Sequence, residues 1–208
     1  MWPIIFNPFP YKIFFGIFLT GIVIKIMDDY MDREFDKLIN RDNTTKILGS
    51  GVLPYALFIF SLACILNPVT AVSLFFASFA TGMAGNLNAK MPSGLYGYQE
   101  ALITIVMGLV LFGVMEMFSS LLLIFAIQLW DDYVDYNSDR YSIKNWAFIL
   151  GKNECLLLGI IFFILSVYLD YFKALSGIFS MWIIVYIIKL WFNYIDKPQI
   201  SDEEVPGA

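Results

Sequence analysis

The sequence predicts an all-α fold, a polytopic membrane helical bundle with about seven transmembrane helices. Hydrophobic residues make up 59% of the 208 residues and the mean hydropathy is +0.71, which exceeds what the core of a soluble domain requires. Charged residues make up only 15% of the chain. The apolar residues also fall into long runs that are separated by short polar or turn-forming segments, as expected for helices that cross a bilayer repeatedly.

Apolar stretches of spanning or nearly spanning length follow one another along the chain. Tight turns at Asn67-Pro68 and at Gly113 to Glu116 separate neighbouring helices. The spans form one membrane domain over residues 1–195, preceded by an interfacial segment rather than a signal peptide, and residues 196–208 are a polar tail expected to be disordered. The expected spans are Tyr11–Met27, Val52–Leu66, Val69–Gly85, Ala101–Val114, Met117–Trp130, Ala147–Leu169 and Ala174–Trp191.

An acidic motif occurs twice, as DDYMDREFD at Asp28–Asp36 and as DDYVDYNSD at Asp131–Asp139. Each copy directly follows an apolar run, so each lies where a helix leaves the hydrophobic region. Like charges at helical spacing repel one another, so we expect a cation to compensate them. If each helix continues through its motif, the aspartates that share a face are Asp29, Asp32 and Asp36 in the first copy, with Asp28 one turn before Asp32, and Asp132, Asp135 and Asp139 in the second.

The likeness of the two regions extends beyond the acids. The tripeptide ILG occurs at Ile47–Gly49 and again at Ile149–Gly151, and a long apolar helix follows each copy. We interpret the chain as an internal pseudo-repeat of two helix, acid loop and helix units.

Composition excludes several functional classes. Half of the 18 acidic residues lie in the two motifs, so the net charge of -5 reflects these clusters and a short acidic tail, and nucleic acid is not an expected partner. The absence of histidine removes the usual zinc ligand and general base. Cys64 and Cys155 lie in or near apolar runs without paired spacing, so no disulfide is expected.

The basic residues predict the orientation of an integral, multi-pass membrane protein. If the first acidic loop is cytoplasmic, most of the Lys and Arg residues lie on that side, which follows the positive-inside rule. The N-terminus is then outside, the C-terminus is inside, and both aspartate motifs are on the cytoplasmic face. The basic residues of that face are Arg33, Lys37, Arg41, Lys46, Lys90, Arg140, Lys144, Lys152 and Lys197, whereas Lys12 and Lys173 lie outside.

Two carboxylate clusters at one end of a helical bundle are suited to Mg²⁺, which prefers oxygen ligands and is commonly shared between carboxylates and substrate phosphates. A diphosphate bound there would have its charge neutralised. Aromatic residues, 18% of the chain, could stabilise a carbocation or serve as ordinary packing. The candidate metal ligands are Asp28, Asp29, Asp32, Asp36, Asp132, Asp135 and Asp139, and the candidate diphosphate contacts are Asp28, Arg33, Lys46, Arg140, Lys144 and Glu100.

Simpler explanations exist for each of these residues. The acids could form solvated loops that stay out of the bilayer, and Arg33 and Lys37 could pair with them at helical spacing. Lys and Arg residues in these loops also set the orientation. Glu100 could equally complement the dipole of the helix that it opens.

The two motifs resemble those of the UbiA-type intramembrane prenyltransferases. DDYMDREFDKLINRDNTTKILGSGVLPYAL is similar to their first signature, NDxxDxxxD followed by a basic and small-residue stretch ending in SG. WDDYVDYNSDRYSIKNWAFILG resembles their second, DxxDxxGD followed by a basic residue, and PSGLYGYQEALITIVMGLVLFG resembles the segment between them. The likeness covers nearly the whole chain.

The resemblance implies a helical bundle around a central cavity that binds Mg²⁺ and an isoprenyl diphosphate and transfers the prenyl group to a small aromatic or lipid acceptor. Asp28 stands in place of the leading Asn, and Lys46 and Arg140 stand where basic diphosphate contacts are expected. The implied catalytic residues are Asp29, Asp32, Asp132 and Asp135, with Asp36 and Asp139 completing the motifs.

The chain departs from the family pattern in places. Ser138 replaces a Gly, Lys46-Ile47-Leu48 replaces Arg-Pro-Leu, and Asn145-Trp146-Ala147 replaces Thr-Leu-Pro. The expected seven spans compare with about nine in the family. Two alternatives therefore stay open. One is a terpene cyclase that ionises the same diphosphate without an external acceptor, and the other is a non-catalytic membrane protein that binds a divalent ion or lipid diphosphate, or that carries cations.

Overall fold

The computed structural model describes residues 10–38, 41–83, 87–137 and 145–195. Within these ranges the regular structure is helical, apart from one isolated bridge between Lys90 and Tyr96, so the all-α prediction is confirmed. Asp139, Arg140, Lys144 and the expected tail lie outside the described residues. The helices are α1 (Pro10–Leu38), α2 (Thr45–Leu48), α3 (Val52–Leu66), α4 (Pro68–Met83), α5 (Gly97–Phe112), α6 (Val114–Val134), α7 (Trp146–Leu150), α8 (Lys152–Leu169) and α9 (Tyr171–Ile195), with 3₁₀ turns at Gly49–Gly51 and Asp135–Asn137.

The described helices fit a multi-pass membrane protein. Five segments are long and apolar enough to cross a membrane, and they contain α1, α2 with α3, α6, α8 and α9. Helices α4 and α5 are shorter apolar helices of 16 residues each. The expected continuous span Ala147–Leu169 is wrong in one respect, because the chain breaks at Gly151, where a φ of 104° separates α7 from α8.

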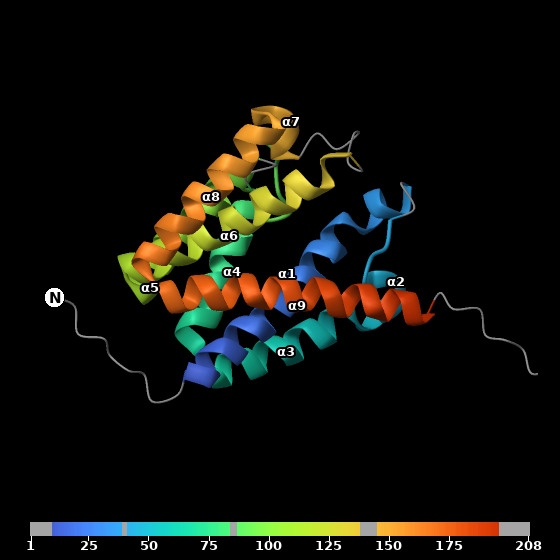
Figure 1. Cartoon of the computed structure of the whole chain (residues 1–208), viewed down its shortest axis with the longest axis horizontal. Coiled ribbons are helices and arrows are strands. Elements are labelled where there is room, and N and C mark those ends of the chain that lie inside the picture. The colour runs from blue at the N-terminus through green and yellow to red at the C-terminus, as the bar shows by residue number, and fades with distance from the viewer. Residues whose placement is uncertain (1–9, 39–40, 84–86, 138–144, 196–208) are drawn as a thin grey trace, which may run out of the picture.

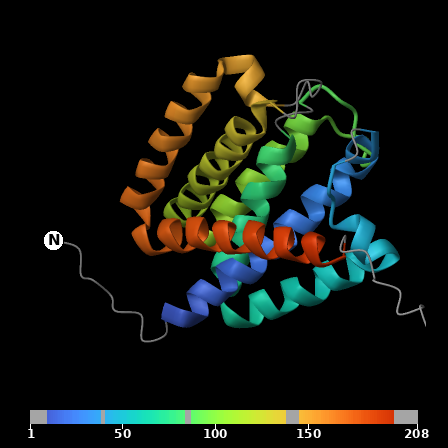
Figure 2. The same ribbon diagram turned by 45° about the vertical axis from the view of Figure 1, so that its right-hand side comes forward.

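The bundle is built from two similar helical pairs with further helices packed on them. Helix α3 runs beside α1, and α8 runs beside α6, as both Figure 1 and Figure 2 show. Helix α4 packs against α1 and α6, and so joins the pairs, while α5 packs against α4. Helix α9 lies across the bundle in contact with α1, α8 and α6. The two pairs correspond to the two halves of the pseudo-repeat.

Small residues allow the helices to approach closely. Many fully buried positions are Ala or Ser, including Ala63, Ala71, Ala126 and Ser119, the composition that membrane helix interfaces favour. A Cβ added at Gly159 of α8 would come within 2.7 Å of the Trp130 ring of α6. The close contact between α6 and α8 therefore depends on the absence of a side chain at Gly159.

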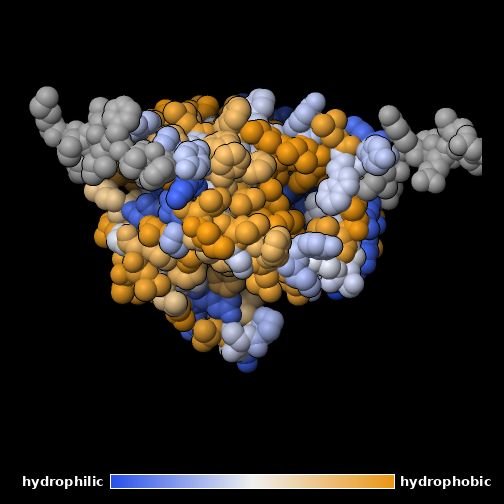
Figure 3. Space-filling view, turned by 90° about the horizontal axis from the view of Figure 1, so that it is seen from below, coloured by the Kyte–Doolittle hydropathy of each residue, from blue (hydrophilic) through white to orange (hydrophobic). Residues whose placement is uncertain are grey.

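The outer surface is strongly apolar. Large hydrophobic side chains of α3, α5, α8 and α9 are exposed, among them Phe58, Val110, Tyr168 and Trp182. Figure 3 shows one face on which hydrophobic residues predominate. Exposed apolar surface on this scale is costly in water and is expected where helices face lipid.

A buried ion pair joins three helices close to the start of α6. The Lys173 ammonium of α9 is 1% exposed and lies 2.7 Å from the Glu116 carboxylate of α6. It also donates to the hydroxyls of Ser119 and Ser120, while Ser73 of α4 donates to Glu116. Each buried charge is thus both paired and hydrogen-bonded, which is the condition for keeping it inside.

Replacing Glu116 with Ala should destabilise the bundle by about 3–5 kcal/mol, because the buried Lys173 ammonium would lose the carboxylate that it contacts. The double change Lys173→Met with Glu116→Leu should recover most of that loss, since it removes both charges. The free energy of unfolding in mild detergent measures both effects, and Glu154→Ala, at an exposed acid of α8, is the control expected to change it by less than about 1 kcal/mol. Equal stability of Glu116→Ala and the control would contradict the role given to the pair.

Candidate functional site

The first acidic motif lies on the last turns of α1. The helix continues to Leu38, so Asp28, Asp29, Asp32 and Asp36 are all helical, as the spacing predicts. Their environments differ, because Asp29 and Asp36 are each 6% exposed, Asp32 is half-buried and Asp28 is exposed. The motif therefore turns part of its acidic face into the protein.

The second acidic motif does not form the continuous stripe that its spacing predicts. Helix α6 ends at Val134, and Asp135 begins a 3₁₀ turn. Asp131 and Asp132 are thus on the last turn of α6, while Asp135 lies just beyond it. The expected continuous helix is wrong at Asp135, since a 3₁₀ turn begins there and changes the angle between successive side chains, and Asp139 lies outside the described residues.

The two motifs lie together although they are far apart in the sequence. The guanidinium of Arg41, in the loop after α1, forms an ion pair with the carboxylate of Asp135. Asp131 of α6 interacts electrostatically with Lys25 and Asp28 of α1. The ends of α1 and α6 therefore form one acidic rim, which we define as Asp28, Asp29, Asp32 and Asp36 together with Asp131, Asp132 and Asp135.

Lys25, which lies three residues before the first motif, is a cation that compensates the charge of its acids. Its ammonium lies 3.0 Å from Asp29 Oδ1 and 3.4 Å from Asp28 Oδ2, and it also interacts with Asp131 of the other motif. Opposite charges at these distances offset the repulsion among the acids. The sequence alone indicates only that Lys25 is at the end of a helix.

The loop that follows α1 folds back onto the first motif. Asn43 Nδ2 donates to the Asp29 carbonyl at 2.7 Å and to Asp36 Oδ2 at 2.6 Å. The Thr44 amide donates to Asp29 Oδ2 at 2.9 Å. Both Asp29 oxygens thus have partners within the protein, one in Thr44 and one in Lys25.

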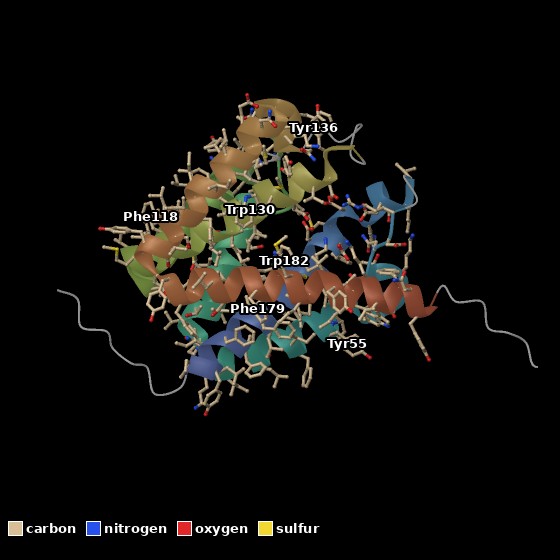
Figure 4. The ribbon with its side chains drawn as sticks, in the orientation of Figure 1. Tyr55, Phe118, Trp130, Tyr136, Phe179 and Trp182 are labelled. Carbon is tan, nitrogen blue, oxygen red and sulfur yellow. The ribbon has the colours of Figure 1, made fainter. Side chains whose placement is uncertain are left out.

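The chain after the second motif makes the same kind of contact. Asn145 Nδ2 donates to the Asp132 carbonyl at 3.1 Å, and the Trp146 amide donates to Asp132 Oδ2 at 2.9 Å. Short helix α7 then begins at Trp146, and its Phe148 ring stacks on Tyr136 with ring centroids 4.6 Å apart. Figure 4 shows Tyr136 beside α7.

The basic residues that the sequence suggests as diphosphate contacts lie in different surroundings. Arg33 pairs with Glu34 at 3.1 Å and lies over the Tyr30 ring at 5.1 Å, so it sits among neighbours on its own helix. Lys46 is exposed in the last turn of α2. Arg41 pairs across the rim, so it is better placed than Arg33 or Lys46 to contact a ligand held there.

Glu100 lies in the first turn of α5, as the sequence predicts. Its carboxylate accepts a hydrogen bond from Ser93 in the preceding loop. The neighbouring Gln99 and Tyr96 form a reciprocal cap at this helix start. These contacts favour the helix-dipole role of Glu100 over the diphosphate role.

The oxygen donors of the rim suit Mg²⁺ only where other ligands complete its coordination. Among the described residues, no three acidic or cysteine side chains converge closely enough to hold a metal ion by themselves. Mg²⁺, however, is usually held by one or two carboxylates, with water and substrate phosphate completing its octahedron. Oxygen donors on two facing helix ends fit a metal that arrives together with a diphosphate.

Four residues at the rim, Lys25, Arg41, Asn43 and Asn145, have roles that the acidic motif does not indicate. A signal for two of them is present in the sequence. The repeated ILG is the end of a longer match, NTTKILG against NWAFILG, whose first residues are Asn43 and Asn145. Lys25 and Arg41 carry no comparable signal, because their partners become neighbours only when the helices pack.

Comparisons with models of known protein families, with curated proteins and with solved structures find no match.

The Arg41 and Asp135 ion pair should hold the two motifs together. In a double-mutant cycle with Arg41→Gln and Asp135→Asn, we expect a coupling energy of about 1 kcal/mol, because both groups are partly buried. The free energy of unfolding in low-salt detergent provides the measurement. Arg33→Gln with Glu34→Gln is the matched control at an exposed pair, with coupling near zero, and a comparable value for both cycles would rule out a special role for the cross-rim pair.

Proposed function

We propose that the protein is a Mg²⁺-dependent intramembrane prenyltransferase, which ionises an isoprenyl diphosphate and transfers the prenyl group to an aromatic or lipid acceptor. The observation that carries the proposal is the meeting of the two aspartate motifs in one acidic rim, through the ion pair of Arg41 with Asp135 and the electrostatic interaction of Lys25 with Asp131. A rim of this kind on an apolar membrane bundle matches an amphiphile with a polyanionic head and a hydrocarbon tail.

The rim has acids for the metal and cations for the diphosphate oxygens of the proposed ligand. Asp28 and Asp32 on α1 and Asp131 and Asp135 on α6 and its 3₁₀ turn are the acids that we propose hold Mg²⁺, which when bound would neutralise the diphosphate and improve it as a leaving group. The cations Lys25 and Arg41 already lie among these acids. In the proposed complex they exchange a carboxylate partner for diphosphate oxygens.

The reaction is a substitution at an allylic carbon. The bond between C1 of the prenyl chain and the diphosphate oxygen breaks, and both electrons leave with the diphosphate. A nucleophilic carbon or oxygen of the acceptor then bonds to C1, and the acceptor loses one proton. The cations of the rim stabilise the charge that develops on the leaving group, while the apolar bundle excludes the water that would otherwise capture the prenyl cation.

The tail is proposed to lie along the apolar body. An apolar surface of α9 is formed by Leu175, Ile178, Phe179 and Trp182, and Figure 4 shows Phe179 and Trp182 along this helix. Such a surface accepts an isoprenoid chain by hydrophobic contact.

A terpene cyclase is the second candidate, and it is favoured by the helix count. The described residues contain seven helices of at least 15 residues, against about nine spans in the family that the motifs resemble. Fewer helices leave less protein to form an acceptor pocket. The substrate's own double bonds would then capture the cation.

Purified protein incubated with Mg²⁺, labelled prenyl diphosphates and a panel of phenolic, quinone-precursor and lipid acceptors tests the proposal. A prenylated acceptor supports the transferase, whereas a hydrocarbon or terpene alcohol formed without acceptor identifies the cyclase. If no diphosphate is consumed, both are wrong. Mg²⁺-dependent ion flux in proteoliposomes would instead indicate a carrier.

Asp32→Asn and Asp135→Asn should each lower the turnover rate by roughly 100-fold or more, because each removes one anionic oxygen that binds the metal and diphosphate. Glu34→Gln, on the same helix but 72% exposed, is the matched control and should retain the wild-type rate. Diphosphate release under saturating Mg²⁺ measures the effect, and near-normal rates in both Asp variants would remove the rim from the reaction.

A further inference from the structure

The two motif regions share a hydrogen-bonding pattern in addition to their sequence. In each, an Asn amide donates to the backbone carbonyl of an Asp, at 2.7 Å for Asn43 and 3.1 Å for Asn145. The next residue then donates its backbone amide to the carboxylate of that same Asp, at 2.9 Å in both copies. The Asp residues are Asp29 and Asp132.

A third bond completes the pattern. The Asn side-chain oxygen accepts the backbone amide two residues later, at 2.8 Å from Thr45 in the first copy and 2.8 Å from Ala147 in the second. In the second copy this bond caps α7, whose N-cap is Asn145, and in the first copy it lies just before α2, whose N-cap is Thr44. Each short helix ends at a glycine of positive φ, Gly49 at 54° and Gly151 at 104°, where the chain turns into the next long helix.

Burial makes these bonds consequential. Asn43 and Asn145 are each 2% exposed, and Asp29 is 6% exposed. Buried polar groups that lose a partner cost more than the bond itself contributes, so each set of bonds should form or break as a unit. The two copies arise from separate parts of the chain, which argues against a coincidental contact.

We infer that Asp29 with Asn43, and Asp132 with Asn145, are two equivalent latches, and that Asp29 and Asp132 are positioning residues. Each latch ties a short helix onto the end of the helix that carries the acidic motif. This assignment rests on the proposed function for its catalytic part, and it withdraws Asp29 and Asp132 from the metal ligands and catalytic residues that the sequence suggests.

The first latch positions the basic side chains of its loop. Arg41 lies two residues before Asn43, and its backbone amide donates to the Asp36 carbonyl at 2.9 Å. The Asn43 side chain also bonds Asp36, so the latch fixes both ends of the segment that carries Arg41. Lys46 follows on α2. Opening the latch should therefore weaken diphosphate binding more than it slows the chemical step.

Hydrogen exchange tests the latches without reference to activity. In Asn43→Ala, the amides of residues 43–51 should exchange about tenfold faster while those of 145–151 stay unchanged, and Asn145→Ala should show the reverse. Asp29→Asn keeps an oxygen acceptor for the Thr44 amide, so its exchange should stay within about threefold of wild type. Asn67→Ala, at another helix start, is the matched control. Unchanged exchange in Asn43→Ala and Asn145→Ala would overturn the latches.

Metal binding tests whether Asp29 is a ligand. Binding of Mn²⁺ with inorganic pyrophosphate, followed by electron paramagnetic resonance, should be within about threefold of wild type in Asp29→Asn and weakened at least tenfold in Asp32→Asn. Equal weakening in both variants would make Asp29 a ligand and overturn the positioning role.

The kinetic arm separates positioning from a purely structural role. In Asn43→Ala, KM for the prenyl diphosphate should rise about tenfold with kcat lowered less than threefold, whereas the control Asn67→Ala should stay near wild type in both. A fall in kcat alone would contradict the positioning of the basic loop. If exchange responds as expected but wild-type protein neither binds Mn²⁺ nor consumes diphosphate, the latches stand and the proposed function fails.

Discussion

The gathering of acids at the end of an apolar bundle is the constraint on which the rest of this structure depends. Seven described carboxylates lie at the ends of α1 and α6, which the Arg41 and Asp135 ion pair links, and in such a place their repulsion is weakly screened. The compensation comes from three sources. Lys25 and Arg41 supply positive charge, and the Thr44 and Trp146 amides and the Asn43 side chain supply hydrogen bonds. The short helices and the loop after α1 serve this balance.

The opposite kind of polar site occurs near the start of α6. There Lys173 and Glu116 form one pair with serine hydroxyls around it, and every charge has a counter-charge inside the protein. The acidic rim instead gathers acids of both motifs around Lys25 and Arg41. The first arrangement is closed and suits a structural role, whereas the second lies where the two motifs meet.

Much of the fold could be predicted from the sequence, because apolar runs and turn residues are local signals. The tight turns at Asn67 and Gly113 and the helix through the first motif agree with the structure, whereas five of the expected spans are long enough to cross a membrane and Ala147–Leu169 is broken at Gly151. The end of α6 at Val134 could not be predicted, since the acids after it have the same spacing as those in α1. The cross-rim partner of Asp135 could not be predicted either, because Arg41 is 94 residues away in the chain and only packing makes them neighbours.

The latches give a physical reason for one departure of this chain from the family that its motifs resemble. Asn145-Trp146-Ala147 stands where that family has Thr-Leu-Pro, and a Pro in the third position would have no amide to give to the Asn145 side chain. The chain instead uses the same Asn-headed segment after both motifs. Because the same hydrogen bonds attach a short helix after each motif, α2 and α7 are held in the same way even though the backbones of the two acidic segments differ. The α-helical first motif and the 3₁₀ turn of the second then meet as unlike surfaces at the rim.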